Sequence, residues 1–213
     1  MKGIGVLLSG GGTNLQAIID TIEHGNIAAD INLVLSDRPD AYGLIRAEKR
    51  GIPAYCINRK KFKDAGSFNE AILEKLTAHH VEYIVLAGYL SILSPKLVEC
   101  YRNKIINIHP SLIPAFCGKG YYGDKVHQAV LDYGVKLTGA TVHFVDEGTD
   151  TGPIIFQKAV EVLPDDTVET LSRRVLAVEH ELLPKAVALL VQDRLKVSGR
   201  KVILKSSGMM SNS

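Results

Sequence analysis

IGVLLSGGGTNLQAIIDTI, residues 4–22, combines an apolar run, a glycine run and a helical repeat in one short segment. The apolar run has no polar alternation, which is typical of a β-strand covered on both faces in a parallel sheet. The glycines occupy 10–12. Beyond them, apolar residues recur at the spacing of one helix face: Leu15, Ile18, Ile19 and Ile22. The segment therefore predicts a strand, a tight turn and a helix.

The same rhythm continues along the chain. Further buried strands are predicted at 31–36, 54–57 and 83–88, with helices at 42–49 and around 68–76. Strands that alternate with helices at these lengths form right-handed βαβ units. We therefore expect an α/β fold, with an open, mostly parallel, twisted sheet of Rossmann-like type and helices on both faces.

The pattern changes after residue 105. Strands are predicted at 104–110, 139–145 and 153–160, and a long helix from Thr167 that Pro184 kinks or divides. A small C-terminal hairpin is expected around Ser198–Lys201. We expect a single domain over residues 1–205 and a disordered tail at 206–213.

Composition limits the partners of the protein. With 25 basic and 23 acidic residues, the formal net charge is +2, which gives no broad field for nucleic acid or for a membrane. Cys56, Cys100 and Cys117 are odd in number and lack C-x-x-C spacing, which argues against a disulfide framework and a thiolate zinc site. There is no signal-peptide pattern and no apolar stretch of about 18 residues. We expect a cytoplasmic protein that binds neither nucleic acid nor membranes.

The glycine run predicts a phosphate site. Gly10–Gly12 and Thr13 lead a strand directly into a helix, so that unpaired N–H groups face outward at the positive end of the helix dipole. No lysine follows as in an ATP loop, and Leu15 stands where a dinucleotide fingerprint has glycine. A monophosphate is therefore favoured, and a tight turn without a ligand is the alternative.

INIHPSLIP, residues 106–114, places an amide and an imidazole two positions apart. On a strand, Asn107 and His109 project from the same face, at the carboxyl end where such sheets bind ligands. Together they can polarise a carbonyl, stabilise an oxyanion and move a proton. The alternative is a strand end satisfied by backbone hydrogen bonds.

VDEGTDTGP, residues 145–153, adds carboxylates in a loop between two strands. One of Asp146, Glu147 and Asp150 beside His109 would favour the imidazolium and raise its pKa. The loop pattern does not choose among the three, and a solvated turn is the alternative. No pair of histidines has metal-ligand spacing with a carboxylate, so no metal is expected.

Five motifs in this order resemble those of the phosphoribosylglycinamide formyltransferases, folate-dependent enzymes of purine biosynthesis: SGGGTNLQAII, LAGYLSILSP, INIHPSLIP, GATVHFVDEGTDTGPII and AVEHELLP. The resemblance implies a catalytic set of Asn107, His109 and Asp150. It implies ribonucleotide contacts at Gly12, Thr13, Asn14 and Glu179. It implies folate contacts at Leu90, Ser91, Ile92, Leu93, Asn107, Val145, Asp146, Glu147 and Asp150.

The resemblance also implies a reaction. The amine of glycinamide ribonucleotide attacks the formyl group of 10-formyltetrahydrofolate directly, and the catalytic set stabilises the tetrahedral intermediate and moves the proton. The formyl folate is a cosubstrate, no metal takes part, and the expected partners are these small molecules alone. A monomer or a homodimer is expected.

The sequence departs from the family pattern in places. Ser91 stands where some relatives have arginine, and Lys60, Lys61 and Lys63 are candidates to meet the folate tail or are parts of a solvated basic loop. The segment 114–125 is longer than in some relatives, and is interpreted as a mobile flap over the folate or as a surface insertion. Three further histidines are expected to be structural: His127, His143 and His180.

Other functions remain open at this stage. Formyltetrahydrofolate deformylases carry the same three residues, usually with an extra N-terminal domain, and methionyl-tRNA formyltransferases have a C-terminal RNA-binding domain. A folate- or nucleotide-binding module without turnover would be expected to lack one of the three. A dinucleotide oxidoreductase, suggested by Asp37 after the second strand, is disfavoured by the broken glycine fingerprint.

Overall fold

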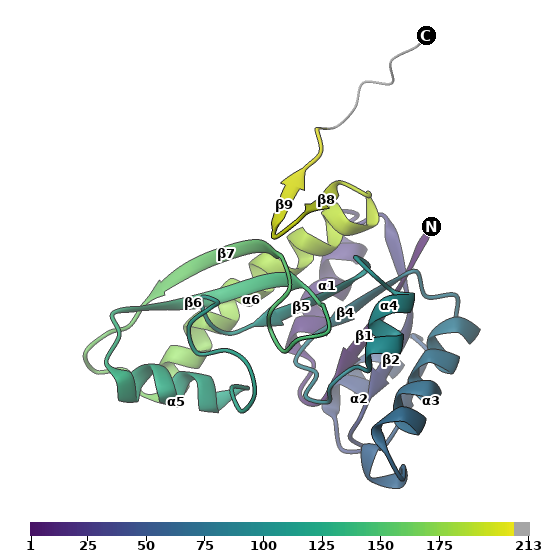
Figure 1. The fold of residues 1–213 in the computed structure, drawn as a ribbon, viewed down its shortest axis with the longest axis horizontal. Coiled ribbons are helices and arrows are strands. Elements are labelled where there is room, and N and C mark those ends of the chain that lie inside the picture. The colour runs from purple at the N-terminus through teal and green to yellow at the C-terminus, as the bar shows by residue number, and fades with distance from the viewer. Residues whose placement is uncertain (207–213) are drawn as a thin grey trace.

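The computed structural model describes residues 1–206 and contains the predicted α/β fold (Figure 1). Its strands are β1 (Lys2–Leu8), β2 (Ala29–Ser36), β3 (Ala54–Cys56), β4 (Tyr83–Leu86), β5 (Ile105–His109), β6 (Leu137–Phe144), β7 (Ile154–Glu161), β8 (Leu195–Ser198) and β9 (Lys201–Leu204). Its helices are α1 (Thr13–Glu23), α2 (Tyr42–Glu48), α3 (Ala65–Ala78), α4 (Pro95–Cys100), α5 (Asp124–Tyr133) and α6 (Val168–Val191).

The described strands form one nine-stranded sheet in the order β3-β2-β1-β4-β5-β6-β7-β9-β8. Strands β1 to β5 pair with one another in parallel. Strand β6 runs antiparallel to β5, and β7 antiparallel to β6. The hairpin β8–β9 closes the far edge. The open, mostly parallel sheet and the C-terminal hairpin are thus confirmed.

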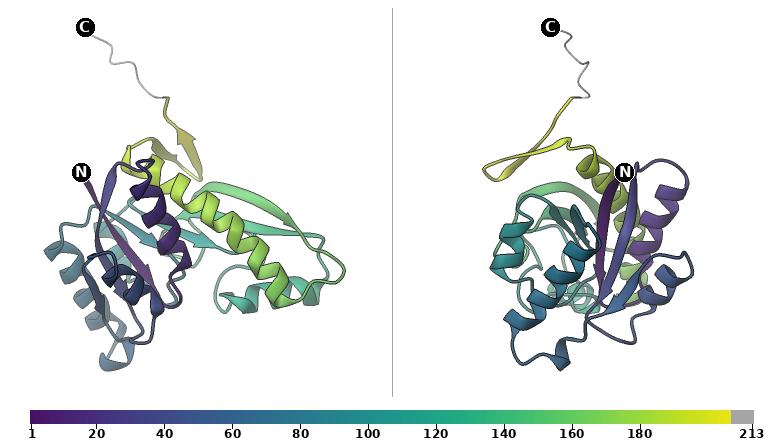
Figure 2. Two further views of the ribbon diagram at one scale, coloured as in Figure 1. Left: turned by 180° about the vertical axis from the view of Figure 1, so that it is seen from behind. Right: turned by 90° about the vertical axis from the view of Figure 1, so that its right-hand side faces the viewer.

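Helices cover both faces of the sheet. Helices α1 and α6 lie side by side on one face, as the rear view in Figure 2 shows, and α3 and α4 cover the other. Successive residues of β4 pack on opposite faces of the sheet. Tyr83 and Val85 belong to the apolar cluster under α1 and α6, and Ile84 and Leu86 belong to the cluster under α3 and α4. Each strand in the centre of the sheet is therefore apolar on both faces.

The same alternation positions polar side chains at the end of β5. Ile106 and Ile108 belong to the cluster on the α6 side, and Ile105 belongs to the cluster on the α3 side. Asn107 and His109 have the parity of Ile105, so they project from the α3 side of the sheet. They stand at the carboxyl end of β5, next to the point where the sheet changes from parallel to antiparallel pairing.

The glycine turn before α1 is held by α2. Gly12 has φ +70°, and a Cβ built on it would lie 2.6 Å from the Cα of Gly43. The Gly43 amide donates to the Gly10 carbonyl at 3.0 Å, and the Arg46 guanidinium donates to the Gly11 carbonyl at 2.8 Å. The left-handed conformation and the close contact both require glycine at position 12.

Helix α6 differs from expectation in one respect. It begins where expected, and Thr167 is its N-cap, accepting from the Thr170 amide at 3.2 Å. The helix then continues through Pro184 to Val191, so of the two expected effects of Pro184, a kink or a division, the division is wrong. Pro184 is buried with Leu183 and Val187 on the face that packs against the sheet. This packing compensates for the backbone hydrogen bond that proline cannot donate.

Two helices were not predicted. Helix α4 has only six residues, with Ser94 as its N-cap and Pro95 in its first turn, which is too short for an apolar period to show. Helix α5 buries Val126 and Val130 on a single face. No helix within residues 1–206 is long and apolar enough to cross a membrane. Apart from Ser206, the tail expected at 206–213 lies outside the described residues.

Candidate active site

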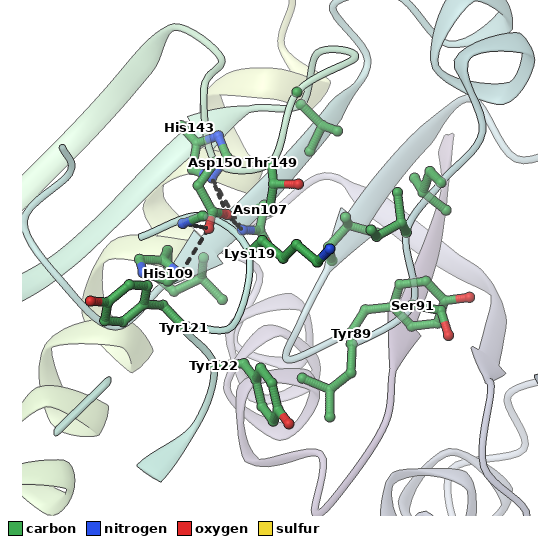
Figure 3. Close-up of a pocket in the computed structure, with 18 of the residues that line it drawn as sticks. Tyr89, Ser91, Asn107, His109, Lys119, Tyr121, Tyr122, His143, Thr149 and Asp150 are labelled. Carbon is green, nitrogen blue, oxygen red and sulfur yellow. Dashed lines mark hydrogen bonds and ion pairs between the residues drawn. The ribbon is translucent and has the colours of Figure 1, made fainter. Parts of the chain in front are cut away.

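A cavity of about 270 Å³ opens at the carboxyl ends of β4 and β5, on the α3 side of the sheet (Figure 3). Its walls are the segment after β4, the loop between β5 and α5, and the loop between β6 and β7. Every residue that the resemblance implied for folate lines it: Leu90, Ser91, Ile92, Leu93, Asn107, Val145, Asp146, Glu147 and Asp150. The cavity therefore joins segments that are up to about sixty residues apart in the chain.

The catalytic set expected from the sequence converges at the base of this cavity. Asp150 Oδ2 lies 3.6 Å from His109 Nδ1, and Asp150 Oδ1 lies 3.5 Å from Asn107 Nδ2. Asp150 has φ +58°, a left-handed conformation that aspartate tolerates better than most residues. Asp150 lies in the loop between β6 and β7, and this backbone conformation directs its carboxylate toward the end of β5.

The structure distinguishes the three acids of that loop. Asp146 Oδ1 accepts from the Thr151 hydroxyl at 2.5 Å and from the Gly148 amide at 3.1 Å, so it stabilises its own turn. Glu147 is half exposed and pairs with Arg102 at 2.6 Å. Asp150 is the acid that contacts His109.

The loop between β5 and α5 closes over the set through its backbone. The Phe116 carbonyl accepts from His109 Nε2 at 2.9 Å, and the Gly118 amide donates to Asp150 Oδ2 at 2.9 Å. His109 is consequently only 4% exposed. The part of the expected flap at 114–125 that lies nearest the site thus forms one wall of it.

The protonation of His109 differs from expectation. Burial lowers the pKa of His109, and this effect outweighs the Asp150 carboxylate and the Phe116 carbonyl, which raise it. Asp150 thus acts on His109 in the expected direction, but burial outweighs it and the net pKa lies below the usual value. Burial also raises the pKa of Asp150, but its polar neighbours, the Gly118 amide among them, lower it more, and the net pKa is below the usual value.

His143 was expected to be structural, but it lines the cavity. It is 2% exposed, and its Nε2 lies 3.1 Å from Asn107 Nδ2 and 3.6 Å from Asp150 Oδ1. Its position opposite Asn107 on β6 follows from the register of the antiparallel pair. His127 and His180 do not line the cavity.

Two departures from the family pattern, Ser91 and the position of the basic residues, can be located relative to the cavity. The Ser91 hydroxyl donates to Asp37 Oδ2 at 2.6 Å. Lys119 is the one lysine or arginine within residues 1–206 that lines the cavity. The three candidate lysines for the folate tail are exposed and lie outside the lining: Lys60, Lys61 and Lys63.

The expected phosphate site lies outside this cavity, at the start of α1. The first turn of α1 carries no acidic residue, and Gly12 provides no side-chain cap, so the helix dipole is not neutralised there. The Arg46 guanidinium borders the turn through its bond to the Gly11 carbonyl, a tertiary contact that the sequence pattern did not indicate.

Asn14 and Glu179 meet behind that turn. Asn14 Nδ2 donates to Glu179 Oε2 at 2.6 Å, and both side chains are buried. Burial raises the pKa of Glu179 to about 7, against the lowering effect of the Asn14 hydrogen bond. Within residues 1–206, no group of three or more histidine, cysteine or acidic side chains is arranged to hold a metal ion.

The comparisons with known proteins agree with this geometry. A family model described as formyl transferase matches residues 2–187, so the class of the protein is that of the formyl transferases. The phosphoribosylglycinamide formyltransferase of Bacillus subtilis (strain 168) is 44% identical over 90% of this chain and 95% of its own length. The chain belongs to the phosphoribosylglycinamide formyltransferase family.

Two other relatives extend the comparison. The structure of glycinamide ribonucleotide transformylase 1 from Symbiobacterium toebii has a TM-score of 0.91 and 45% identity, over 97% of this chain and 95% of that one. The trifunctional purine biosynthetic protein adenosine-3 of Bos taurus is 45% identical over 92% of this chain. The match spans only 19% of the bovine protein's length.

Proposed function

We propose that this protein transfers the formyl group of 10-formyltetrahydrofolate to the amine of glycinamide ribonucleotide, a step of purine biosynthesis. The observation that carries the proposal is the convergence of Asn107, His109 and Asp150 at the base of one cavity. Relatives named for this activity match nearly the whole chain, which supports it.

The cavity is the site for the formyl donor. Its wall at Leu90–Leu93 is a loop segment whose backbone groups can pair with the edge of a pterin, and the 145–150 loop faces it. Apolar side chains such as Leu86, Leu93 and Val98 line the interior, as expected for a flat heterocycle. The formyl group would then reach Asn107 and His109.

The start of α1 is the site for the phosphate of the acceptor. The amides of Gly12, Thr13 and Asn14, which have no intrahelical acceptor at the start of a helix, supply donors, and Arg46 adds a positive charge beside them. Glu179 reaches the same region through Asn14 and would contact the ribonucleotide. The phosphate is thereby held apart from the reacting amine, which must approach the end of β5.

The chemistry needs one bond formed, one broken and one proton moved. The amine nitrogen bonds to the formyl carbon, the bond from that carbon to N10 of the folate breaks, and a proton passes from the amine to N10. An amide N–H of Asn107 stabilises the oxyanion of the tetrahedral intermediate. His109, whose pKa burial lowers, takes the amine proton as negative charge develops, and Asp150 stabilises the resulting imidazolium.

An absorbance assay for loss of 10-formyl folate tests the proposal. It is run with glycinamide ribonucleotide and without it, with formate measured in parallel. Turnover that requires the ribonucleotide and releases no formate is expected. Formate release without acceptor would instead identify a deformylase, and no turnover in either reaction would identify a binding module.

A further inference from the structure

His143 is the buried titratable side chain of the cavity that the proposed chemistry does not use. It faces Asn107 directly across the antiparallel pair of β5 and β6, where opposed side chains are close enough to interact. Its ring also contacts the Phe144 carbonyl and lies near Asp150, and His109 is close enough to interact with it electrostatically. Each ring nitrogen therefore has its own partner.

The Nδ1 partner fixes the tautomer of His143. Nδ1 lies 2.8 Å from the Phe144 carbonyl oxygen, which can only accept, so Nδ1 carries a proton. In the neutral ring Nε2 then has a lone pair. Nε2 lies 3.1 Å from Asn107 Nδ2, within hydrogen-bond distance, but 3.6 Å from Asp150 Oδ1, which is beyond it.

The Asn107 amide has one orientation that satisfies these neighbours. With Nδ2 facing inward, it donates one N–H to His143 Nε2 and directs the other toward Asp150 Oδ1, 3.5 Å away. With the amide reversed, its oxygen would face both the lone pair of Nε2 and the carboxylate of Asp150. Hydrogen-bond acceptors would then face one another without a donor between them, which raises the free energy of a buried site.

We propose that His143 is a positioning residue that accepts a hydrogen bond from Asn107 and so keeps the second Asn107 N–H directed at the oxyanion. The long contact of that N–H with Asp150 is one that a developing negative charge can replace without reorganisation of the amide. The inference rests on the proposed function, because it assigns Asn107 the oxyanion of the formyl transfer.

Two substitutions separate this role from a structural one. In His143→Gln, the side-chain oxygen can occupy the place of Nε2 and accept from Asn107. In His143→Asn, the amide can occupy the place of Nδ1 and donate to the Phe144 carbonyl, but Asn107 loses its acceptor. His127→Gln, at another buried histidine, is the matched control for loss of an imidazole from the core.

Steady-state kinetics on the folded variants give the first readout. We expect His143→Asn to lose up to about 10²-fold in kcat. The hydrogen bond from Asn107 to the oxyanion forms only in the transition state, so its loss lowers kcat. KM for both substrates should change only a few fold. His143→Gln should recover most of kcat, and His127→Gln should keep it. Equal kcat for His143→Asn and His143→Gln, or a higher kcat for His143→Asn, would overturn the proposal.

Long-range ¹H–¹⁵N correlation spectra of the imidazoles give a readout that does not need turnover. The signals of His143 are assigned by their loss in His143→Gln. We expect the proton on Nδ1, which faces the Phe144 carbonyl, and a bare Nε2. A proton on Nε2 would overturn the inference. An inactive wild-type protein would refute the proposed function, and the spectra would still decide the orientation.

Discussion

The side-chain amide of Asn14 donates a 2.6 Å hydrogen bond to the Glu179 carboxylate, which joins the first turn of α1 to the middle of α6 across 165 positions. Both side chains are more than nine-tenths buried. Asn14 Oδ1 has no partner within the described residues. Within the described residues, the recorded side-chain donor to this buried carboxylate is thus the neutral amide of Asn14, close to the expected phosphate turn.

Glu179→Gln is expected to stabilise the protein above neutral pH. Burial raises the pKa of Glu179 from 4.5 to about 7. The folded state therefore holds a proton that the unfolded state releases, and the free energy of unfolding falls as pH rises from 4.5 to about 7. The variant should gain up to about 3 kcal/mol at pH 8, at 1.36 kcal/mol per pKa unit. Its new amide can also donate to Asn14 Oδ1.

Urea unfolding at pH 5 and pH 8 measures this effect. The wild-type protein should lose more stability between the two pH values than Glu179→Gln does. Equal losses in both proteins would mean that Glu179 stays ionised throughout. Isothermal titration with glycinamide ribonucleotide, run beside it, should show weaker binding by the variant.

His109→Ala is expected to lose at least about 10²-fold in kcat, since a positioned group that takes a proton in the transition state typically contributes that much. Ribonucleotide affinity should stay within a few fold, because the start of α1 lies outside the cavity that holds His109. Stopped assays give kcat, and calorimetric titration gives the affinity. A parallel loss of affinity would contradict the separation of the two sites.

Asp150→Asn is expected to lower activity and to move its pH dependence. The Asp150 carboxylate raises the pKa of His109 against the larger lowering by burial. Removal of that charge should lower the pKa of His109 further, so the acidic limb of the kcat profile should move to lower pH. A profile from pH 5 to pH 9 gives the result, and an unmoved limb would show that the two groups do not titrate together.

Gly12→Ala is expected to weaken ribonucleotide binding and stability together. The new Cβ would lie 2.6 Å from Gly43 Cα at a φ of +70°, so the turn must move or carry strain. Strain of this kind typically costs about 1–3 kcal/mol. Gly10→Ala is the matched control, because its Cβ would meet no atom within 4 Å. Thermal unfolding and titration of both variants provide the comparison, and equal behaviour would refute the conformational role of Gly12.

Much of the fold could be predicted from local pattern. The strand, turn and helix of residues 4–22 follow from an unbroken apolar run and a 3.6-residue period, which are properties of neighbours in sequence. The continuity of α6 through Pro184 could not be predicted in this way, because burial against the sheet decides it. Propensity alone favours a break there.

The candidate site divides in the same manner. Asn107 and His109 share a face because they are two apart on a strand, and this was predictable. The contact of His143 with Asn107 depends on the register of β5 against β6, and the contact of Arg46 with the Gly11 carbonyl depends on how α2 docks. The lowered pKa of His109 depends on a loop that covers it. Such tertiary facts have no signature in composition or period.

The hydrogen bonds between the Phe116 carbonyl and His109, and between the Gly118 amide and Asp150, affect how resistance to inhibitors could arise. Every amino acid carries a backbone carbonyl, and all except proline carry an amide hydrogen. A compound that bonds to this backbone would contact groups that few resistance mutations can remove. A compound that gains its affinity from the side chains of Tyr121 or Tyr122, in the same loop, would lose binding when those residues are mutated. Such mutations would leave the bonds to His109 and Asp150 intact, so resistance would arise easily.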